Sequence, residues 1–234
     1  MKNKNKFISF WEERAKNNFE FIHSASNLTS DPKIAKKKHA YELDVLSKVL
    51  KLNGPYNSAI DFGAGTCQWT PLLSELSKNV LCFDNSKSML ELGKKYMATL
   101  NKKNITFSSK KLIDLAKHEN TPFDLFFVSG VLLYMDDKLL VDFCKFICQT
   151  NSSKSSILLR EPIGIDKEFK LDNIYSEALS SYYSANYRTR NQIIEIFENL
   201  GYNLEDCFWM HPEDSKLNKW KETKLSVFYF RKIK

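Results

Sequence analysis

Short apolar runs alternate with helical patterns through most of the chain, and this alternation constrains its fold more than any other feature. Strands that alternate with helices predict a parallel sheet covered by helices on both faces. The expected strands are Ser58–Phe62, Val80–Phe83, Ile105–Ser108, Phe123–Ser129 and Ser156–Arg160. The helices expected between them are Thr70–Leu76, Ser88–Leu100, Leu112–His118 and Asp137–Cys148.

The two ends of the chain depart from this rhythm. Two helical patterns come first, one from about Phe7 to Phe21 and one after Asp31-Pro32. The apolar side of the second pattern has Ile34, Tyr41, Val45, Leu46 and Val49. After Pro162 we expect a helix over Asp172–Ser184. A capping box at Thr189–Gln192 should then open a helix over Ile193–Leu200. Two last strands are expected over Asn203–Met210 and Leu225–Lys232. A length of 234 residues fits one domain, 1–234, with a helical N-terminal lid (1–52) and an inserted helical substrate cap (163–190).

The composition excludes several classes of protein. A content of 43% hydrophobic and 13% aromatic residues argues against disorder. No apolar run approaches the roughly 20 residues of a membrane span, and the charged N-terminus lacks the apolar centre of a signal peptide. We therefore expect a cytoplasmic protein. The net charge of +7 would allow anionic partners, but scattered lysines favour a solvated face over a nucleic-acid footprint, even at Lys36–Lys38.

Cysteines and histidines give no sign of a metal site. The five cysteines are an odd number without a CxxC pair, and buried thiols are favoured over a two-ligand metal fragment at Cys144 and Cys148. The four histidines stand apart from one another, so we expect no bound metal. Only His23, close to the expected N-terminal lid, could face a substrate.

The loop after the first strand reads Asp61-Phe62-Gly63-Ala64-Gly65-Thr66-Cys67-Gln68. Gly63 and Gly65 let the backbone approach a ligand where a side chain would collide. The dinucleotide fingerprint requires a further glycine at the position of Gln68. Asp61 would repel phosphates, so the acidic start of this loop suits a cationic ligand.

Three segments, in the same order and at similar spacing, resemble the motifs of class I S-adenosylmethionine-dependent methyltransferases. They are the glycine loop Asp61–Gly65, the segment Leu81–Leu90 with its acidic Asp84, and Phe123–Leu132. This resemblance implies an α/β fold, namely a Rossmann-like, seven-stranded, mostly parallel sheet with helices on both faces and an antiparallel last strand. It also implies S-adenosylmethionine as the methyl donor and S-adenosylhomocysteine as the product.

The resemblance also assigns roles in donor binding. Asp84 would accept hydrogen bonds from both ribose hydroxyls, which two carboxylate oxygens can do. Met89 would pack against the adenine, and Ser129 would line the side that carries the methyl group. Phe10–Ala15 resembles a helix that many small-molecule members fold over the cofactor, where Trp11 could cover the donor and Arg14 could pair with its carboxylate; a surface helix with Trp11 packed inward is the alternative. The other donor-binding residues expected from the resemblance are Asp61, Gly63, Ala64, Gly65 and Asn85.

Two positions depart from the family pattern. Cys67 stands where a third glycine is often found, so we expect a loop that lies slightly tighter against its helix. After the third strand, lysines stand where the family commonly has an aspartate near the adenine amine. We expect backbone contacts around Lys111 and Leu112 to replace that side chain.

Residues for the methyl acceptor should follow the fourth and fifth strands and lie in the insertion. Tyr134 follows the fourth strand, and Arg160-Glu161 ends the fifth, where Glu161 could act as a base, orient an amine, or hold the loop through an ion pair. The other candidates are Tyr183, Tyr187, Arg188 and Arg190. They could cradle a phosphate or carboxylate; alternatively, the tyrosines form the apolar side of the insertion and Arg188 is solvated.

The favoured function is methyl transfer to an oxygen or nitrogen of a small, anionic metabolite by in-line displacement. The main alternative is an RNA or protein methyltransferase, which the net charge of +7 would suit. A non-catalytic cofactor-binding protein is the third hypothesis. The sequence does not indicate an oligomeric state.

Overall fold

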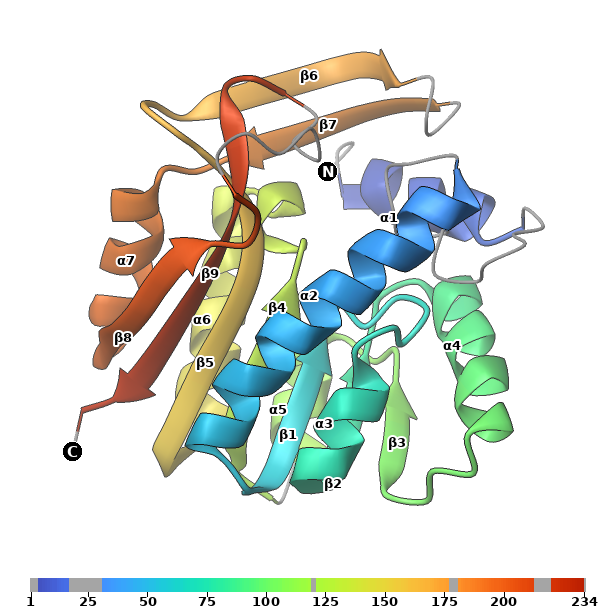
Figure 1. Cartoon of the computed structure of the whole chain (residues 1–234), viewed down its shortest axis with the longest axis vertical. Helices are drawn as coiled ribbons and strands as arrows, with labels where there is room; N and C mark the ends of the chain where they lie inside the picture. The colour runs from blue at the N-terminus through green and yellow to red at the C-terminus, as the bar shows by residue number, and fades with distance from the viewer. Residues whose placement is uncertain (1–3, 17–30, 119–120, 177–180, 213–219, 234) are drawn as a thin grey trace. The chain divides into compact units, whose positions relative to one another are not determined.

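A computed structural model describes residues 4–16, 31–118, 121–176, 181–212 and 220–233 (Figure 1). The chain forms two compact units. The first unit comprises residues 1–110 and 173–183, and the second comprises residues 111–172 and 184–234.

The main sheet has seven strands and confirms the predicted fold class. Its order is β3 (Ile105–Ser108), β2 (Ser77–Phe83), β1 (Tyr56–Phe62), β4 (Phe123–Ser129), β5 (Asn151–Gly164), β9 (Thr223–Lys232) and β8 (Tyr202–Trp209). The pairs β1–β2, β2–β3 and β4–β5 are parallel. The last strand, β9, is antiparallel to both of its neighbours, β5 and β8.

Helices of the first unit begin where the sequence provides capping side chains. Its helices are α1 (Lys4–Arg14), α2 (Pro32–Asn53), α3 (Thr70–Leu76) and α4 (Lys87–Thr99). The Asp31 carboxylate caps α2 by accepting hydrogen bonds from the next turn, and the Ser86 hydroxyl caps α4. In α2 the buried residues include Leu46 and Leu50, whereas Ile34 and Tyr41 are each 46% exposed. The predicted apolar face of this helix was therefore wrong at those two positions.

In the second unit, local signals again set the helix boundaries. Its helices are α5 (Leu112–His118), the short 3-10 helix η2 (Leu132–Tyr134), α6 (Asp137–Thr150) and α7 (Arg190–Glu198). The predicted capping box is confirmed, because Thr189 and Gln192 bond each other's backbone N–H groups at the start of α7. Aromatic side chains from β4 and α6 pack together in the core of this unit, as at Phe126 and Phe146.

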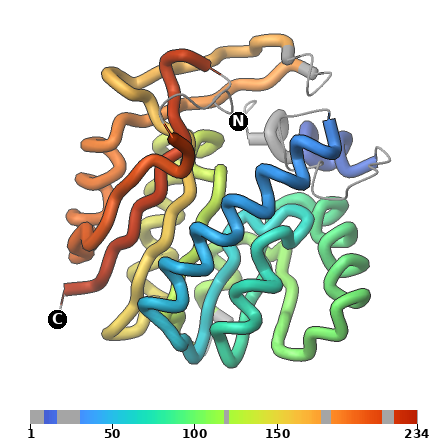
Figure 2. Tube along the Cα trace, in the orientation of Figure 1, coloured from blue at the N-terminus to red at the C-terminus, as the bar shows by residue number. Residues whose placement is uncertain are grey.

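The insertion is a pair of strands and not the predicted helix over Asp172–Ser184. β6 (Phe169–Ser176) and β7 (Ser181–Tyr187) pair as a two-stranded sheet and run side by side in both views (Figure 1 and Figure 2). Along β7, Tyr183, Ala185 and Tyr187 are buried while Tyr182 is 60% exposed, which is the period of two expected for a strand. Aromatic residues favour extended backbone. The predicted helical cap over residues 163–190 was therefore wrong.

None of the helices in the described part of the chain is both long enough and apolar enough to cross a membrane.

Candidate functional site

The glycine loop follows β1 and bends toward the end of β2. Gly63 and Gly65 adopt positive φ angles of 74° and 53°, in the region that favours glycine. The N–H groups of Gly63 and Ala64 both donate to the carbonyl oxygen of Phe83, at 2.7 and 3.0 Å. The loop is thus fixed against the strand that carries Asp84.

Asp84 lies at the end of β2, against the glycine loop. One carboxylate oxygen accepts a hydrogen bond from Gly65 N at 2.9 Å, and the other accepts one from Ser86 N at 2.8 Å. Burial raises the pKa of Asp84 to about 6, although these two bonds favour the charged form, and the nearby Glu12 carboxylate adds to the rise. The structure therefore brings together the two motifs that the sequence predicted to act jointly.

Asp61, the acidic residue before the glycines, is almost fully buried. Its carboxylate accepts a hydrogen bond from Thr70 Oγ1 at 2.6 Å. Burial raises the pKa of Asp61 to about 7, against the effect of the Thr70 bond, and the Asp84 charge raises it further. The sequence analysis missed Thr70, whose only signal is its place as the first residue of the helix that follows the glycine loop.

Cys67 occupies a backbone conformation that favours glycine, with a φ of 59°. Its thiol is fully buried and packs against Gly93 of α4. A Cβ atom added to Gly93 would collide with Cys67 Sγ and would lie 3.2 Å from the carbonyl oxygen of Gly65. The missing side chain at Gly93 therefore leaves the space that the extra side chain at Cys67 needs.

The helix α1 packs on α4 next to Asp84. Trp11 of α1 and Ala15, which directly follows α1, pack with Met89 and Leu92 of α4. The Glu12 carboxylate accepts hydrogen bonds from the backbone N–H of Ser88, at 3.2 Å, and from its hydroxyl.

Burial opposes ionisation of Glu12, but hydrogen bonds from Ser88, Ser86 and Lys87 outweigh it and lower the pKa of this carboxyl. Sequence analysis missed Glu12 and Ser88, which are 76 residues apart. Arg14 is buried at the end of α1, and Asn85 is exposed.

In the second unit, the buried Glu161 carboxylate and the buried Arg188 guanidinium hold the loop after β4. Glu161 Oε1 accepts hydrogen bonds from Val131 N at 2.7 Å and Leu132 N at 3.1 Å. Arg188 donates from Nη1 to the carbonyl oxygen of Leu132 at 2.7 Å and from Nη2 to that of Met135 at 2.9 Å. We call this arrangement of Glu161, Arg188 and residues 131–135 the loop clamp.

The second carboxylate oxygen of Glu161 is buried and has no hydrogen-bond partner within the described parts of the chain. The whole residue is only 1% exposed. Burial raises the pKa of Glu161 to about 7, although the bonds from Val131 and Leu132 and the charges of Arg160 and Arg188 lower it. Glu161 therefore holds the loop through backbone N–H groups and not through the expected ion pair. These bonds use only Oε1.

The other predicted residues have varied environments. Ser129 is half-buried, and its hydroxyl accepts a hydrogen bond from Arg160 Nη1 at 3.2 Å. Tyr134 is half-buried at the end of η2, and Lys111 and Leu112 stand at the start of α5. His23 lies outside the described residues.

Tyr183 and Tyr187 are buried, as expected for the apolar side of the insertion. Arg188 is also buried, so the alternative of a solvated Arg188 was wrong. Its role in binding an anionic substrate stays a prediction.

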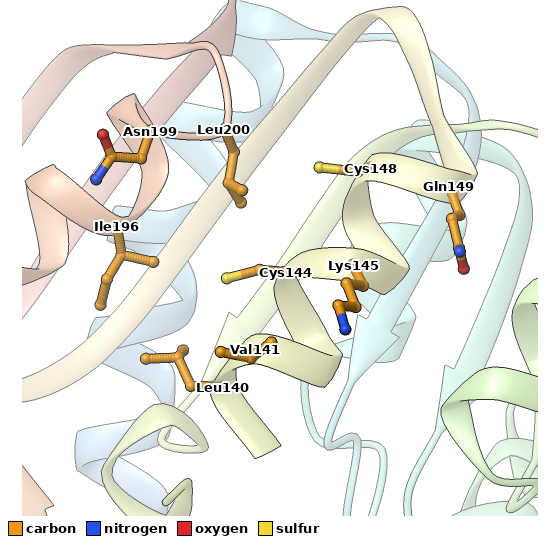
Figure 3. Close-up of a pocket in the computed structure, with 9 residues that line it drawn as sticks. All are labelled: Leu140, Val141, Cys144, Lys145, Cys148, Gln149, Ile196, Asn199 and Leu200. Atoms are coloured by element: carbon orange, nitrogen blue, oxygen red, sulfur yellow. The ribbon is translucent and has the colours of Figure 1, made fainter. Parts of the chain in front are cut away.

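An open apolar groove lies between α6 and α7 of the second unit (Figure 3). Figure 3 shows the sulfur atoms of Cys144 and Cys148 pointing from α6 toward the side of the groove formed by Leu200. Cys148 is exposed, so the expectation that it is buried was wrong. Burial raises the pKa of Cys144 to about 11, and this thiol is protonated at neutral pH. The lining residues include no histidine or carboxylate that could act as an acid or base.

No group of three or more His, Cys, Asp or Glu side chains suited to a metal ion occurs in the described portion of the chain.

Comparison with known proteins finds a family model that matches part of the chain, and solved structures that share its fold. Residues 59–150 match the family model described as a methyltransferase domain. A search of curated protein sequences found no match.

Three solved structures illustrate the shared fold. The N-methyltransferase NodS from Bradyrhizobium japonicum, in complex with S-adenosyl-L-homocysteine, is 13% identical, with a TM-score of 0.64 over 97% of this chain and 98% of that one. The DhpI–SAM–HEP complex is 14% identical, with a TM-score of 0.66 over 99% and 98%. Magnesium protoporphyrin IX methyltransferase from Synechocystis, with bound SAM, is 12% identical, with a TM-score of 0.60 over 97% and 92%.

Proposed function

We propose that the chain is a class I S-adenosylmethionine-dependent methyltransferase and that it methylates a small molecule on nitrogen or oxygen. S-adenosylmethionine supplies a methyl group bound to a positively charged sulfur, which a nucleophile can attack in line. The residues of this chain then have to hold the donor, orient the acceptor and exclude water.

The first unit offers the features that such a donor requires. Gly63 and Gly65 present backbone without side chains, and Asp84 places a two-oxygen acceptor directly beside them. Glu12, whose pKa is lowered, adds negative charge near Asp84, which favours a cation. We propose that Asp84 binds the ribose hydroxyls, that Met89 and Trp11 pack against the adenine, and that the glycine loop contacts the methionine part.

The observation that supports an acceptor with an N–H or O–H group is the second carboxylate oxygen of Glu161, which accepts no hydrogen bond from the described residues. A buried carboxylate oxygen without a donor favours binding of a group that brings one. The proteins with the same fold point the same way, since NodS is an N-methyltransferase and the Synechocystis protein is named for a porphyrin. The name of the Synechocystis protein supports a small molecule as the acceptor.

An anionic substituent on the acceptor is the finer part of the proposal. The expectation rests on Arg188, which uses two N–H groups for the backbone of the loop clamp. A guanidinium has five such groups, and we propose that N–H groups not used for these two carbonyls bind a carboxylate or phosphate. Comparing the KM of a phosphorylated acceptor with that of its neutral parent tests this expectation.

Donor binding tests the proposed function directly. Replacing Asp84 by Ala or Asn should weaken S-adenosylmethionine binding by about 1–3 kcal/mol, or roughly 5–150-fold, because a charged acceptor is lost. Calorimetry on the purified proteins measures this change. The exposed Asp44, which pairs with Lys48 on α2, provides a matched control, and Asp44→Ala should bind normally. A wild-type protein that does not bind the donor would refute the proposal.

A further inference from the structure

We propose that the methylated atom is an amine nitrogen and that Glu161 Oε2 binds this amine and accepts its proton. This inference rests on the proposed function and narrows its acceptor from nitrogen or oxygen to nitrogen. Three arguments support it. They concern the different surroundings of the two carboxylate oxygens, the charge that develops on the acceptor atom during transfer, and the neighbouring arginines.

The two oxygens of Glu161 have separate roles. Oε1 is used by Val131 N and Leu132 N, which fix the carboxylate to the loop after β4. Oε2 is buried and accepts no hydrogen bond from the described residues. An unsatisfied buried acceptor costs free energy that a bound N–H donor would recover. Glu161 also lies near the carboxyl end of β5, and ligands of open parallel sheets bind at the carboxyl ends of strands.

The charge balance of the transfer favours an amine beside a carboxylate. The nitrogen lone pair forms a bond to the methyl carbon, and the carbon–sulfur bond breaks with its electron pair moving to sulfur. Sulfur becomes neutral while the nitrogen becomes a positively charged ammonium, and its proton then passes to Glu161 Oε2. The negative carboxylate stabilises the charge that grows on nitrogen, so its effect is larger in the transition state than before it.

A hydroxyl acceptor fits these surroundings less well. An alcohol becomes a strong nucleophile only as it loses its proton, and a carboxylate is a weak base for that purpose. An alkoxide beside Glu161 would also be repelled by the carboxylate. Arg160 and Arg188 already stabilise the charged form of the Glu161 carboxyl, and they also hold the Ser129 hydroxyl and the carbonyls of Leu132 and Met135.

The test compares matched amines and alcohols on the full-length protein. The acceptor pairs are benzylamine with benzyl alcohol, phenylethylamine with phenylethanol, and glucosamine with glucose, each with a methyl-labelled donor. The wild type should methylate at least one amine and should transfer at least about 10-fold less to the matching alcohol.

Substitution of Glu161 by Gln isolates the second oxygen. The amide keeps one carbonyl oxygen for Val131 and Leu132, so the loop should stay in place while the proton acceptor is lost. We expect Glu161→Gln to lower kcat with the amine by about 100-fold or more, as for loss of a general base. The donor Kd should not change. Glu168→Gln is the matched control, because Glu168 also lies near Arg188 but is paired with Lys170.

Each outcome separates the two proposals. Transfer to an alcohol but to none of the amines, or an undiminished kcat in Glu161→Gln, would overturn the inference and leave methyl transfer intact. A wild type that binds the donor but methylates no amine in the panel also counts against the inference. Failure to bind the donor would instead overturn the proposed function.

Discussion

Cys67 illustrates how a single side chain is accommodated where the backbone favours glycine. Its φ of 59° is strained for a residue with a Cβ atom, and its thiol needs space against α4. Gly93 leaves that space by having no side chain of its own. The departure at Cys67, whose effect the sequence alone did not reveal, is therefore paired with a second residue 26 positions later.

This pairing predicts a non-additive pair of mutations. Gly93→Ala should destabilise the protein by about 1–3 kcal/mol, because the added methyl group overpacks the contact with Cys67 and outweighs the helix propensity of alanine. Adding Cys67→Gly should restore most of the lost stability. Urea unfolding of the wild type, both single variants and the double variant measures the coupling. Additive effects would show that the two side chains do not compete for the same space.

At the level of elements, the loop clamp fixes the segment between β4 and α6. Glu161 binds its N–H groups from β5, and Arg188, directly after β7, binds its carbonyl groups. The carbonyl of Arg188 also accepts a hydrogen bond from Gly164 N at the end of β5. The base of the insertion is therefore tied to the loop that follows β4, and Arg188 acts there as a positioning residue.

Removing the Arg188 guanidinium should loosen this loop. Arg188→Ala leaves two carbonyl groups without their donors, so we expect a loss of roughly 2–4 kcal/mol in the free energy of unfolding. Because a misplaced loop impairs alignment, kcat should fall as well, and Arg188→Lys should restore part of both. Urea unfolding and steady-state kinetics measure these effects.

Arg231, which is exposed and lies over the Tyr229 ring, serves as the control, and Arg231→Ala should change neither quantity greatly. The alternative outcome for Arg188→Ala is a rise in KM that exceeds the fall in kcat. That result with unchanged stability would favour anion binding over positioning.

At the level of the whole molecule, three carboxyl groups with raised pKa values link stability to pH. The pKa is about 7 for Asp61, about 6 for Asp84 and about 7 for Glu161, and burial is the first cause in each case. Between about pH 4 and 7 the folded protein therefore keeps protons that the unfolded chain releases. These groups stabilise the fold fully below about pH 4, and their contribution is lost as the pH rises toward 7.

We therefore expect the donor-free protein to become less stable as the pH rises from about 4.5 to 7, by at most about 1.4 kcal/mol per pH unit for each group. Glu12 and Glu168 have lowered pKa values, so these two groups stabilise the fold when they are charged. Their contribution to stability is lost only as the pH falls below the ordinary pKa of glutamate. Urea midpoints measured across this pH range provide the test. The double variant Asp61→Asn, Glu161→Gln should show a shallower slope, and a wild type that gains stability toward pH 7 would contradict the prediction.

Elements with strong local signals could be predicted closely from the sequence. The strands β3 and β4 and the helices α3 and α5 have the bounds expected from hydrophobic periodicity. The capping box at Thr189 was also predicted, because it is formed by residues three apart. The segment Asp172–Ser184 was predicted as a helix, whereas burial along β7 has the period of two of a strand.

The sequence by itself determined the class of the fold, the glycine loop and the acidic residue beside it, because these depend on short-range patterns and on the order of strands. Only the tertiary structure decided which distant groups meet. Glu12 bonds Ser88 across 76 residues, and Arg188 bonds Leu132 across 56. Such contacts leave no periodic trace in a single sequence, since they arise when chain folding buries polar groups and these must find partners.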